Sequence, residues 1–176
     1  MIRKIVPSTL TLSNLLLGFL AVVFTVKYEL SVVVWLIGLG LVCDFFDGYS
    51  ARKLNTVSVL GKELDSLADL VTFGIAPAIL IYTALLHEVR IFGVVCCIAY
   101  VCCCALRLAR FNVTQNERLG FVGMPTPLAA VLILLVTALV HSFAASIMLL
   151  VISGLMVSRI SFPSLKKMET NPTEDY

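Results

Sequence analysis

The sequence predicts an all-α, polytopic membrane protein with six transmembrane helices and both termini in the cytoplasm. Hydrophobic residues make up 60% of its 176 residues and charged residues only 14%, whereas soluble domains carry about 25% charged residues. The mean hydropathy is +1.02, and apolar stretches long enough to cross about 30 Å of hydrocarbon recur along the chain. Basic residues gather at one set of ends of these stretches, which gives the expected orientation.

The apolar stretches give the expected helices in order: residues 8–26, 31–51, 64–86, 91–110, 124–140 and 143–160. No small-residue cleavage site follows the first stretch, so we expect a retained helix rather than a removed signal peptide. Pro125 and Pro127 suit the first turn of the fifth helix, where a missing amide hydrogen is tolerated. The helices form one membrane domain over residues 1–161, and the polar residues 162–176 are expected to form a disordered tail.

The distribution of the 13 basic residues predicts the orientation in the membrane. Lys27 and Arg90 lie at one set of helix ends, and eleven lie at the other: Arg3, Lys4, Arg52, Lys53, Lys62, Arg107, Arg110, Arg118, Arg159, Lys166 and Lys167. Cytoplasmic loops are the ones that carry an excess of Lys and Arg. Both termini are therefore expected on the cytoplasmic side of the inner (cytoplasmic) cell membrane.

Several residue types that often indicate function are uninformative here. The six cysteines form no paired metal-binding motif, and we expect them to pack as small hydrophobic residues. His87 and His141 lie alone in short outer loops, and a single histidine makes a poor metal site. No basic, aromatic-studded stretch indicates nucleic acid binding.

Four aspartates interrupt the apolar pattern where the second helix ends and the third begins. A carboxylate at the bilayer centre costs about 2.5–3.5 kcal/mol on insertion scales, so a cation is needed to neutralise the group. Asp44 and Asp47 are three residues apart, and Asp65 and Asp69 are four apart, so each pair lies on one helix face. Two facing helices would present four carboxylates to a shared point, which suits Mg²⁺ or Mn²⁺.

The neighbours of the aspartates indicate what the cations would bind. Gly48, Ala51 and Gly61 leave room beside the carboxylates, and Arg52 suits phosphate oxygens. The pattern predicts two divalent ions that grip a diphosphate, with one carboxylate available as a general base. Taken singly, the small residues are more typical of helix–helix contacts, and Arg52 of a cytoplasmic flank.

The combined pattern resembles the signature of the CDP-alcohol phosphotransferases. The matching residues are Asp44, Asp47, Gly48, Ala51, Arg52, Gly61, Asp65 and Asp69. The resemblance implies a six-helix membrane enzyme, expected as a homodimer, that displaces CMP from a CDP-linked lipid. It also implies the site roles: metal ligands Asp44, Asp47, Asp65 and Asp69, with Asp69 also the proton acceptor, and CDP-lipid contacts Gly48, Ala51, Arg52, Ser58 and Gly61. Thr11 and Asn14 resemble residues that line the cytidine pocket.

Three further segments bear on the acceptor alcohol. Residues 63–77, 106–112 and 121–127 resemble the short bacterial phosphatidylserine synthases, which implies CDP-diacylglycerol and L-serine as substrates, in contact with membrane lipids. Arg107 and Arg110, three apart, could bind the serine carboxylate, and Asn112 could accept from its ammonium group. Each arginine alone is equally typical of a cytoplasmic flank.

Three alternatives stay open from the sequence. One is a related synthase that uses glycerol 3-phosphate or inositol phosphate, although a phosphate-bearing acceptor calls for a denser arginine pocket. Another is a divalent-cation channel or transporter, which would leave Gly48, Ala51, Arg52 and Gly61 without a role. The third is a structural membrane adaptor, for which the exchange Asp65→Asn would be harmless.

Overall fold

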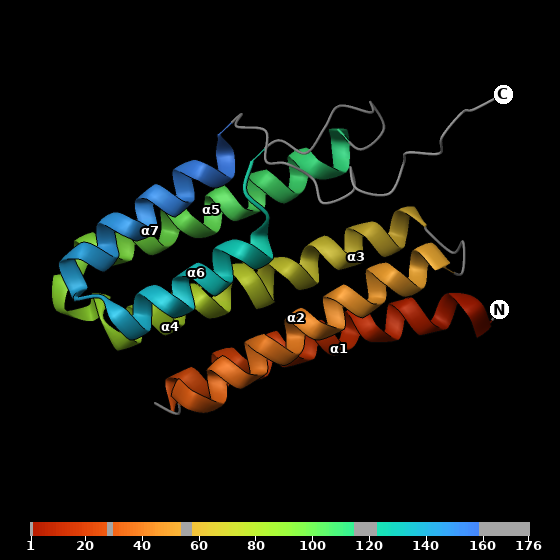
Figure 1. Cartoon of the computed structure of the whole chain (residues 1–176), viewed down its shortest axis with the longest axis horizontal. Helices are drawn as coiled ribbons and strands as arrows, with labels where there is room; N and C mark the ends of the chain where they lie inside the picture. The colour runs from red at the N-terminus through yellow and green to blue at the C-terminus, as the bar shows by residue number, and fades with distance from the viewer. Residues whose placement is uncertain (1, 28–29, 54–57, 115–122, 159–176) are drawn as a thin grey trace, which may run out of the picture.

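The computed structural model describes residues 2–27, 30–53, 58–114 and 123–158, and all regular structure in these ranges is helical (Figure 1). In chain order the elements are α1 (Ile2–Val26), α2 (Leu30–Lys53), α3 (Val59–Asp69), the π-helix η1 (Leu70–Ile75), α4 (Ala76–Ala84), the 3₁₀-helix η2 (Leu86–Val89), α5 (Arg90–Thr114), α6 (Thr126–Leu139) and α7 (Ser142–Val157). The expectation of an all-α protein is confirmed for the described part of the chain.

Four stretches of the described chain are long and apolar enough to cross a membrane: Ser8–Val26, Leu30–Ser50, Val59–Ala84 and Leu86–Val113. The protein is therefore a membrane protein. The other two apolar helices, α6 and α7, have 14 and 16 residues, which is shorter than the roughly 20 residues of a full span. The number of six spans stays a prediction.

Besides the start of α1, at Ile2 rather than at residue 8, two helix boundaries differ from those predicted by four residues or more. The third helix begins at Val59 rather than at residue 64, because Ser58 caps it before the apolar run starts. The fourth continues to Thr114 rather than ending at residue 110. In both places polar residues continue the helix beyond its apolar stretch, which hydropathy alone does not indicate.

The helices lie in two groups with a long rod between them. α3 and α4 join through η1 into this continuous rod, with the α1–α2 pair on one side and α5 and α7 on the other, while α6 packs against α4 (Figure 1). The start of α1, the end of α2, the start of α3 and the end of α5 lie at the same end of the bundle (Figure 1). The aspartates of α2 and α3 are therefore brought to this end.

The bundle has polar residues inside and large apolar residues outside. Trp35 and Ile91 are 75% and 80% exposed, as expected for side chains that face lipid. Asn14 and Thr72 are fully buried, and so is the apolar core, which includes Phe73 in one cluster and Tyr100 in another. Polar groups gathered inside a membrane bundle mark functional or helix-pairing positions.

The π-helix η1 begins directly after Asp69, and its register is explained by the residues around it. The amide of Ala76 donates to the carbonyl of Val71, five residues back. Pro77 follows, which cannot donate a backbone hydrogen bond. The hydroxyl of the buried Tyr100 donates to the carbonyl of Phe73, four residues before Pro77, at 2.7 Å. A side chain from α5 thus satisfies a carbonyl that the proline cannot, as a membrane interior requires.

A tight joint holds α1, α2 and η1 together beside the aspartates. The hydroxyl of Thr72 donates to the backbone carbonyl of Asn14 at 2.9 Å. A Cβ atom on Gly40 would lie 2.6 Å from Cγ2 of Thr72 and 2.9 Å from Oδ1 of Asn14. The absence of a side chain at Gly40 is therefore what lets the three helices approach so closely.

Replacement of this glycine should loosen the joint. We expect Gly40→Ala to lower the free energy of unfolding by about 1–3 kcal/mol, the usual cost of overpacking, because Thr72 is held by its hydrogen bond and cannot turn away. Gly38→Ala on the same helix is the matched control, since a Cβ there meets nothing within 4 Å. Thermal unfolding of both variants in detergent measures the difference, and equal stability would contradict this account of the joint.

Candidate active site

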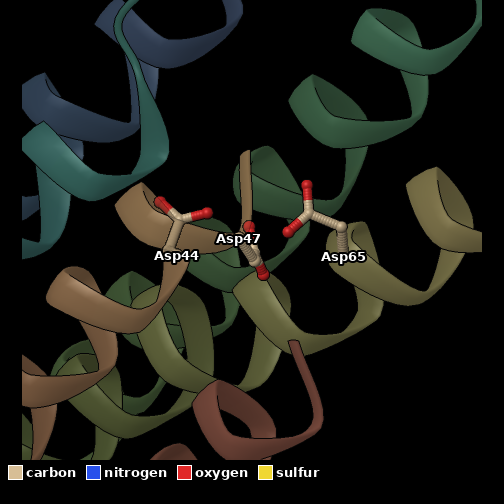
Figure 2. A group of neighbouring side chains, drawn as sticks. All are labelled: Asp44, Asp47 and Asp65. Atoms are coloured by element: carbon tan, nitrogen blue, oxygen red, sulfur yellow. The ribbon is translucent and has the colours of Figure 1, made fainter. Parts of the chain in front are cut away.

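Three of the four aspartates form a compact acidic cluster at the α2–α3 contact. One carboxylate oxygen from each of Asp44, Asp47 and Asp65 lies within 4.8 Å of the other two. Figure 2 shows Asp44 and Asp47 on α2 and Asp65 on the neighbouring α3, with Asp47 between the other two in this view. The helical spacing read from the sequence therefore brings these side chains to one place.

The chemistry of this cluster fits a divalent cation. Carboxylate oxygens are the ligands that hard cations prefer, and Asp47 is buried while Asp44 and Asp65 are half-buried. Within the described ranges, the Oδ1 atom of Asp65 is buried with no hydrogen-bond partner. Three acidic groups so close together repel one another strongly where water is scarce, and a bound cation would remove that repulsion.

Asp69 lies beside this cluster on the next turn of α3. It is only 7% exposed, and its charge interacts with those of Asp44, Asp47 and Asp65. The amide Nδ2 of Asn14 donates to its Oδ1 atom at 3.3 Å. Asp69 thus accepts a defined hydrogen bond from another helix.

Ser58 and Gly61 form the start of α3, the helix that carries Asp65 and Asp69. Ser58 is the N-cap, with an extended backbone, and its hydroxyl accepts from the amide of Gly61 at 3.0 Å. A Cβ on Gly61 would lie 3.0 Å from the same hydroxyl oxygen. This cap fixes the residue at which α3 begins.

The structure describes the side-chain environment of only some of the other residues predicted to contact the CDP-lipid. Gly48 is half-buried on α2, and Thr11 is buried on α1. Ala51 and Arg52 belong to α2, but their side chains lie outside the described part of the structure. The roles that the resemblance implies for these four residues stay predictions.

The three acceptor candidates on α5 have different surroundings. Arg107 is half-buried; its Nη1 donates to the hydroxyl of the buried Thr126 at 2.8 Å, and its charge interacts with those of Asp69 and Asp44. Arg110 is exposed and donates to the carbonyl of Val157 at 3.1 Å. Arg107 therefore lies within electrostatic reach of the aspartates.

Asn112, the third acceptor candidate, links α5 to α3. Its Nδ2 atom lies 3.0 Å from the hydroxyl of Ser66 and 3.3 Å from Oε2 of Glu63. Because Ser66 follows Asp65 directly, this contact holds the turn of α3 that carries Asp65.

Sequence reasoning missed three partners of the predicted residues: Ser66, Thr72 and Thr126. Each is a small hydroxyl residue in or beside an apolar helix, and such residues usually bond to their own helix backbone. Two sequence signals could have identified two of them: Thr72 lies three residues after Asp69, and Ser66 lies next to Asp65. No feature of the sequence links Thr126 to Arg107.

Comparison with known proteins gives matches over most of the chain. Residues 4–158 match the model of the family described as CDP-alcohol phosphatidyltransferase. The chain is 40% identical over 162 residues to the CDP-diacylglycerol–serine O-phosphatidyltransferase of Bacillus subtilis (strain 168), covering 92% of each chain. It is 35% identical to the enzyme of the same name from Helicobacter pylori (strain ATCC 700392 / 26695), covering 94% of this chain and 74% of that one.

An archaeal relative widens the comparison. The chain is 34% identical over 166 residues to the archaetidylserine synthase of Methanothermobacter thermautotrophicus, covering 92% of this chain and 71% of that one. The family match covers the described helices apart from the first two residues of α1, and it includes the acidic cluster. An enzyme is thereby identified, rather than a channel or an adaptor, and the chain belongs to the CDP-alcohol phosphatidyltransferase family.

Proposed function

We propose that this enzyme transfers the phosphatidyl group of CDP-diacylglycerol to the hydroxyl of L-serine and releases CMP. The observation that carries the choice of serine is the 40% identity, over 92% of both chains, to a serine phosphatidyltransferase. The acidic cluster, built from two helices inside the membrane domain, supports the type of reaction.

The proposed metal ligands are Asp44, Asp47, Asp65 and Asp69, holding two divalent cations, Mg²⁺ or Mn²⁺. Such ions, when bound, neutralise the diphosphate and stabilise the departing CMP. Two observations support this assignment: an Asp65 oxygen that has no hydrogen-bond partner among the described residues, and the close approach of the three clustered carboxylates. Gly48, Ala51, Arg52, Ser58, Gly61 and Thr11 are the proposed contacts of the CDP-lipid.

The chemical step is a direct displacement at phosphorus. Asp69 accepts the proton of the serine hydroxyl. The serine oxygen then bonds to the phosphorus that carries diacylglycerol, while the bond from that phosphorus to the bridging oxygen breaks and CMP leaves with that oxygen. Asp69 suits this role because it is buried beside the cluster and held by Asn14.

Serine recognition is assigned mainly to Arg107. Its guanidinium carries five N–H donors, and Thr126 receives one of them. The ring centre of Phe111 lies 5.8 Å from the guanidinium carbon of Arg107. The donors left over can bind the serine carboxylate bidentately, while Arg110 and Asn112 are secondary candidates.

Loss of this arginine should weaken serine binding selectively. We expect Arg107→Gln to raise the KM for serine about tenfold or more, the value of a charge-assisted hydrogen bond, and to leave the KM for CDP-diacylglycerol nearly unchanged. Arg90→Gln is the matched control and should have little effect, because Arg90 is exposed and lies at the opposite end of the same helix, α5. A rise in both KM values for Arg107→Gln would contradict a role specific to serine.

The membrane arrangement is proposed from the charge distribution. All six apolar helices cross the inner membrane, and both termini lie in the cytoplasm. The active site opens on the cytoplasmic side. Eleven of the 13 basic residues lie on that side of the predicted spans. The working form is proposed as a homodimer in contact with membrane lipids, with residues 1–161 as the membrane domain; the predicted tail, residues 162–176, lies outside the described residues.

The proposed function is tested with the purified chain and CDP-diacylglycerol. CMP release is measured with serine, glycerol 3-phosphate or inositol phosphate, in the presence and absence of Mg²⁺ or Mn²⁺. The expected result is that CMP is released with serine but not with the other two acceptors, and only when the metal is present. Release that depends on one of the phosphate-bearing acceptors instead would overturn the choice of serine and leave the reaction type intact.

A further inference from the structure

Asn14 is a polar side chain in an unusual position. It lies within the apolar stretch of α1, Ser8–Val26, and is fully buried. An amide buried in a membrane bundle is unfavourable unless it is hydrogen-bonded. The bond that its Nδ2 makes is to Oδ1 of Asp69, 55 residues away in the sequence, at 3.3 Å.

The orientation of the Asn14 amide follows from its surroundings. Its oxygen faces α2, where a Cβ on Gly40 would lie only 2.9 Å away, and within the described ranges this oxygen has no hydrogen-bond partner. Its nitrogen faces Asp69. An ionised carboxylate only accepts hydrogen bonds, so the amide must present its NH₂ group to Asp69.

The backbone of Asn14 is held just as firmly as its side chain. Its carbonyl accepts from the Thr72 hydroxyl at 2.9 Å. Gly18 on α1 allows this approach, since a Cβ there would lie 2.8 Å from Cα of Thr72. Thr72 lies three residues after Asp69 within η1. α1 is thus tied at two points to the chain around Asp69.

We infer that Asn14 is a positioning residue for Asp69: its amide holds one carboxylate oxygen and leaves the other to take the proton of the acceptor hydroxyl. This inference rests on the proposed function, in which Asp69 is the proton acceptor. It differs from the role in the cytidine pocket that the resemblance implies, because the donor end of the amide is directed to a carboxylate. Asn14 acts through Asp69 and makes no contact with the nucleotide.

The two roles predict different kinetics. A residue that positions Asp69 contributes to kcat, whereas a cytidine contact contributes to the binding of CDP-diacylglycerol and of CMP. We expect Asn14→Leu, which keeps a similar volume without a donor, to lower kcat about 100-fold, the usual cost of misplacing a reacting group. The KM for CDP-diacylglycerol and the affinity for CMP, measured by calorimetry, should stay close to those of the unchanged enzyme.

Two further variants complete the test. Thr25→Val removes another fully buried polar group from α1, one whose hydroxyl donates to Ala21 in its own helix, and should leave kcat unchanged. Asn14→Ala is smaller than the native residue, cannot clash, and should reproduce the slow turnover with intact CMP binding. An unchanged kcat in both Asn14 variants, a rise in KM with kcat preserved, or loss of CMP binding in both would each overturn the inference.

The acceptor preference of the enzyme without substitutions shows which of the two hypotheses fails, the inference about Asn14 or the proposed function. If it releases CMP with an acceptor other than serine, the choice of serine fails, while the kcat ratio measured with that acceptor still tests Asn14. If it uses serine and the Asn14 variants are as fast, the inference fails and the proposed function stands.

Discussion

Asp69→Asn should lower the rate of CMP release by about 10²- to 10⁴-fold, the usual contribution of a general base. An asparagine amide has the shape of the carboxylic acid but cannot take the proton of the serine hydroxyl. The hydrogen bond from Asn14 persists, because the new side-chain oxygen still accepts from Nδ2. The variant should therefore fold and bind CDP-diacylglycerol, and rapid-mixing measurement of CMP release would show the slow chemical step directly.

Glu88→Gln is the control for the removal of a carboxylate. Glu88 lies in η2 and contacts Ser142 at the start of α7, away from the acidic cluster. Its replacement should leave CMP release unchanged. Near-normal turnover by Asp69→Asn would refute the assignment of Asp69 as the proton acceptor.

Asp65→Asn should reduce turnover about 10²- to 10³-fold, as is typical when a group that stabilises transition-state charge is lost. The cause differs from that of Asp69→Asn. Asp65 contributes one of the three oxygens that lie within 4.8 Å of one another, so its loss weakens cation binding. Higher Mg²⁺ or Mn²⁺ concentrations should restore part of the activity of this variant.

Thermal unfolding gives a second measurement for Asp65 that does not depend on turnover. With a chelator present, Asp65→Asn should be more stable than the unchanged protein, because one of several repelling charges is gone. Added Mg²⁺ should raise the melting temperature of the unchanged protein and have a smaller effect on the variant. An equal metal-induced rise in both would show that Asp65 is not a ligand.

Sequence spacing was sufficient for the features that lie within one helix. The periodicity of the α-helix puts residues three and four apart on one face, so the pairs Asp44–Asp47 and Asp65–Asp69 could be predicted without coordinates. The length and composition of the apolar stretches predicted the long helices for the same reason: each depends on a local property of the chain. Of the four aspartates, the three that cluster do so as predicted.

The helix ends were less predictable because they depend on single polar residues. Ser58 starts α3 by accepting from Gly61, five residues before the apolar run was expected to become helical. A capping hydroxyl contributes a local hydrogen bond that hydropathy does not register. The π-helix after Asp69 was also not anticipated, since its register depends on Pro77 together with Tyr100 from another helix.

The sequence by itself determined that this protein is an all-α membrane protein with carboxylates on two successive helices, because hydropathy and helical periodicity are local. Only the tertiary structure decided which other side chains lie around the predicted site. The contact of Asn14 with Asp69 and that of Arg107 with Thr126 both join different helices. Such contacts depend on how far the helices are rotated and how closely they approach. At Gly40 and in η1, steric fit between helices fixes both, and no spacing along the chain encodes that fit.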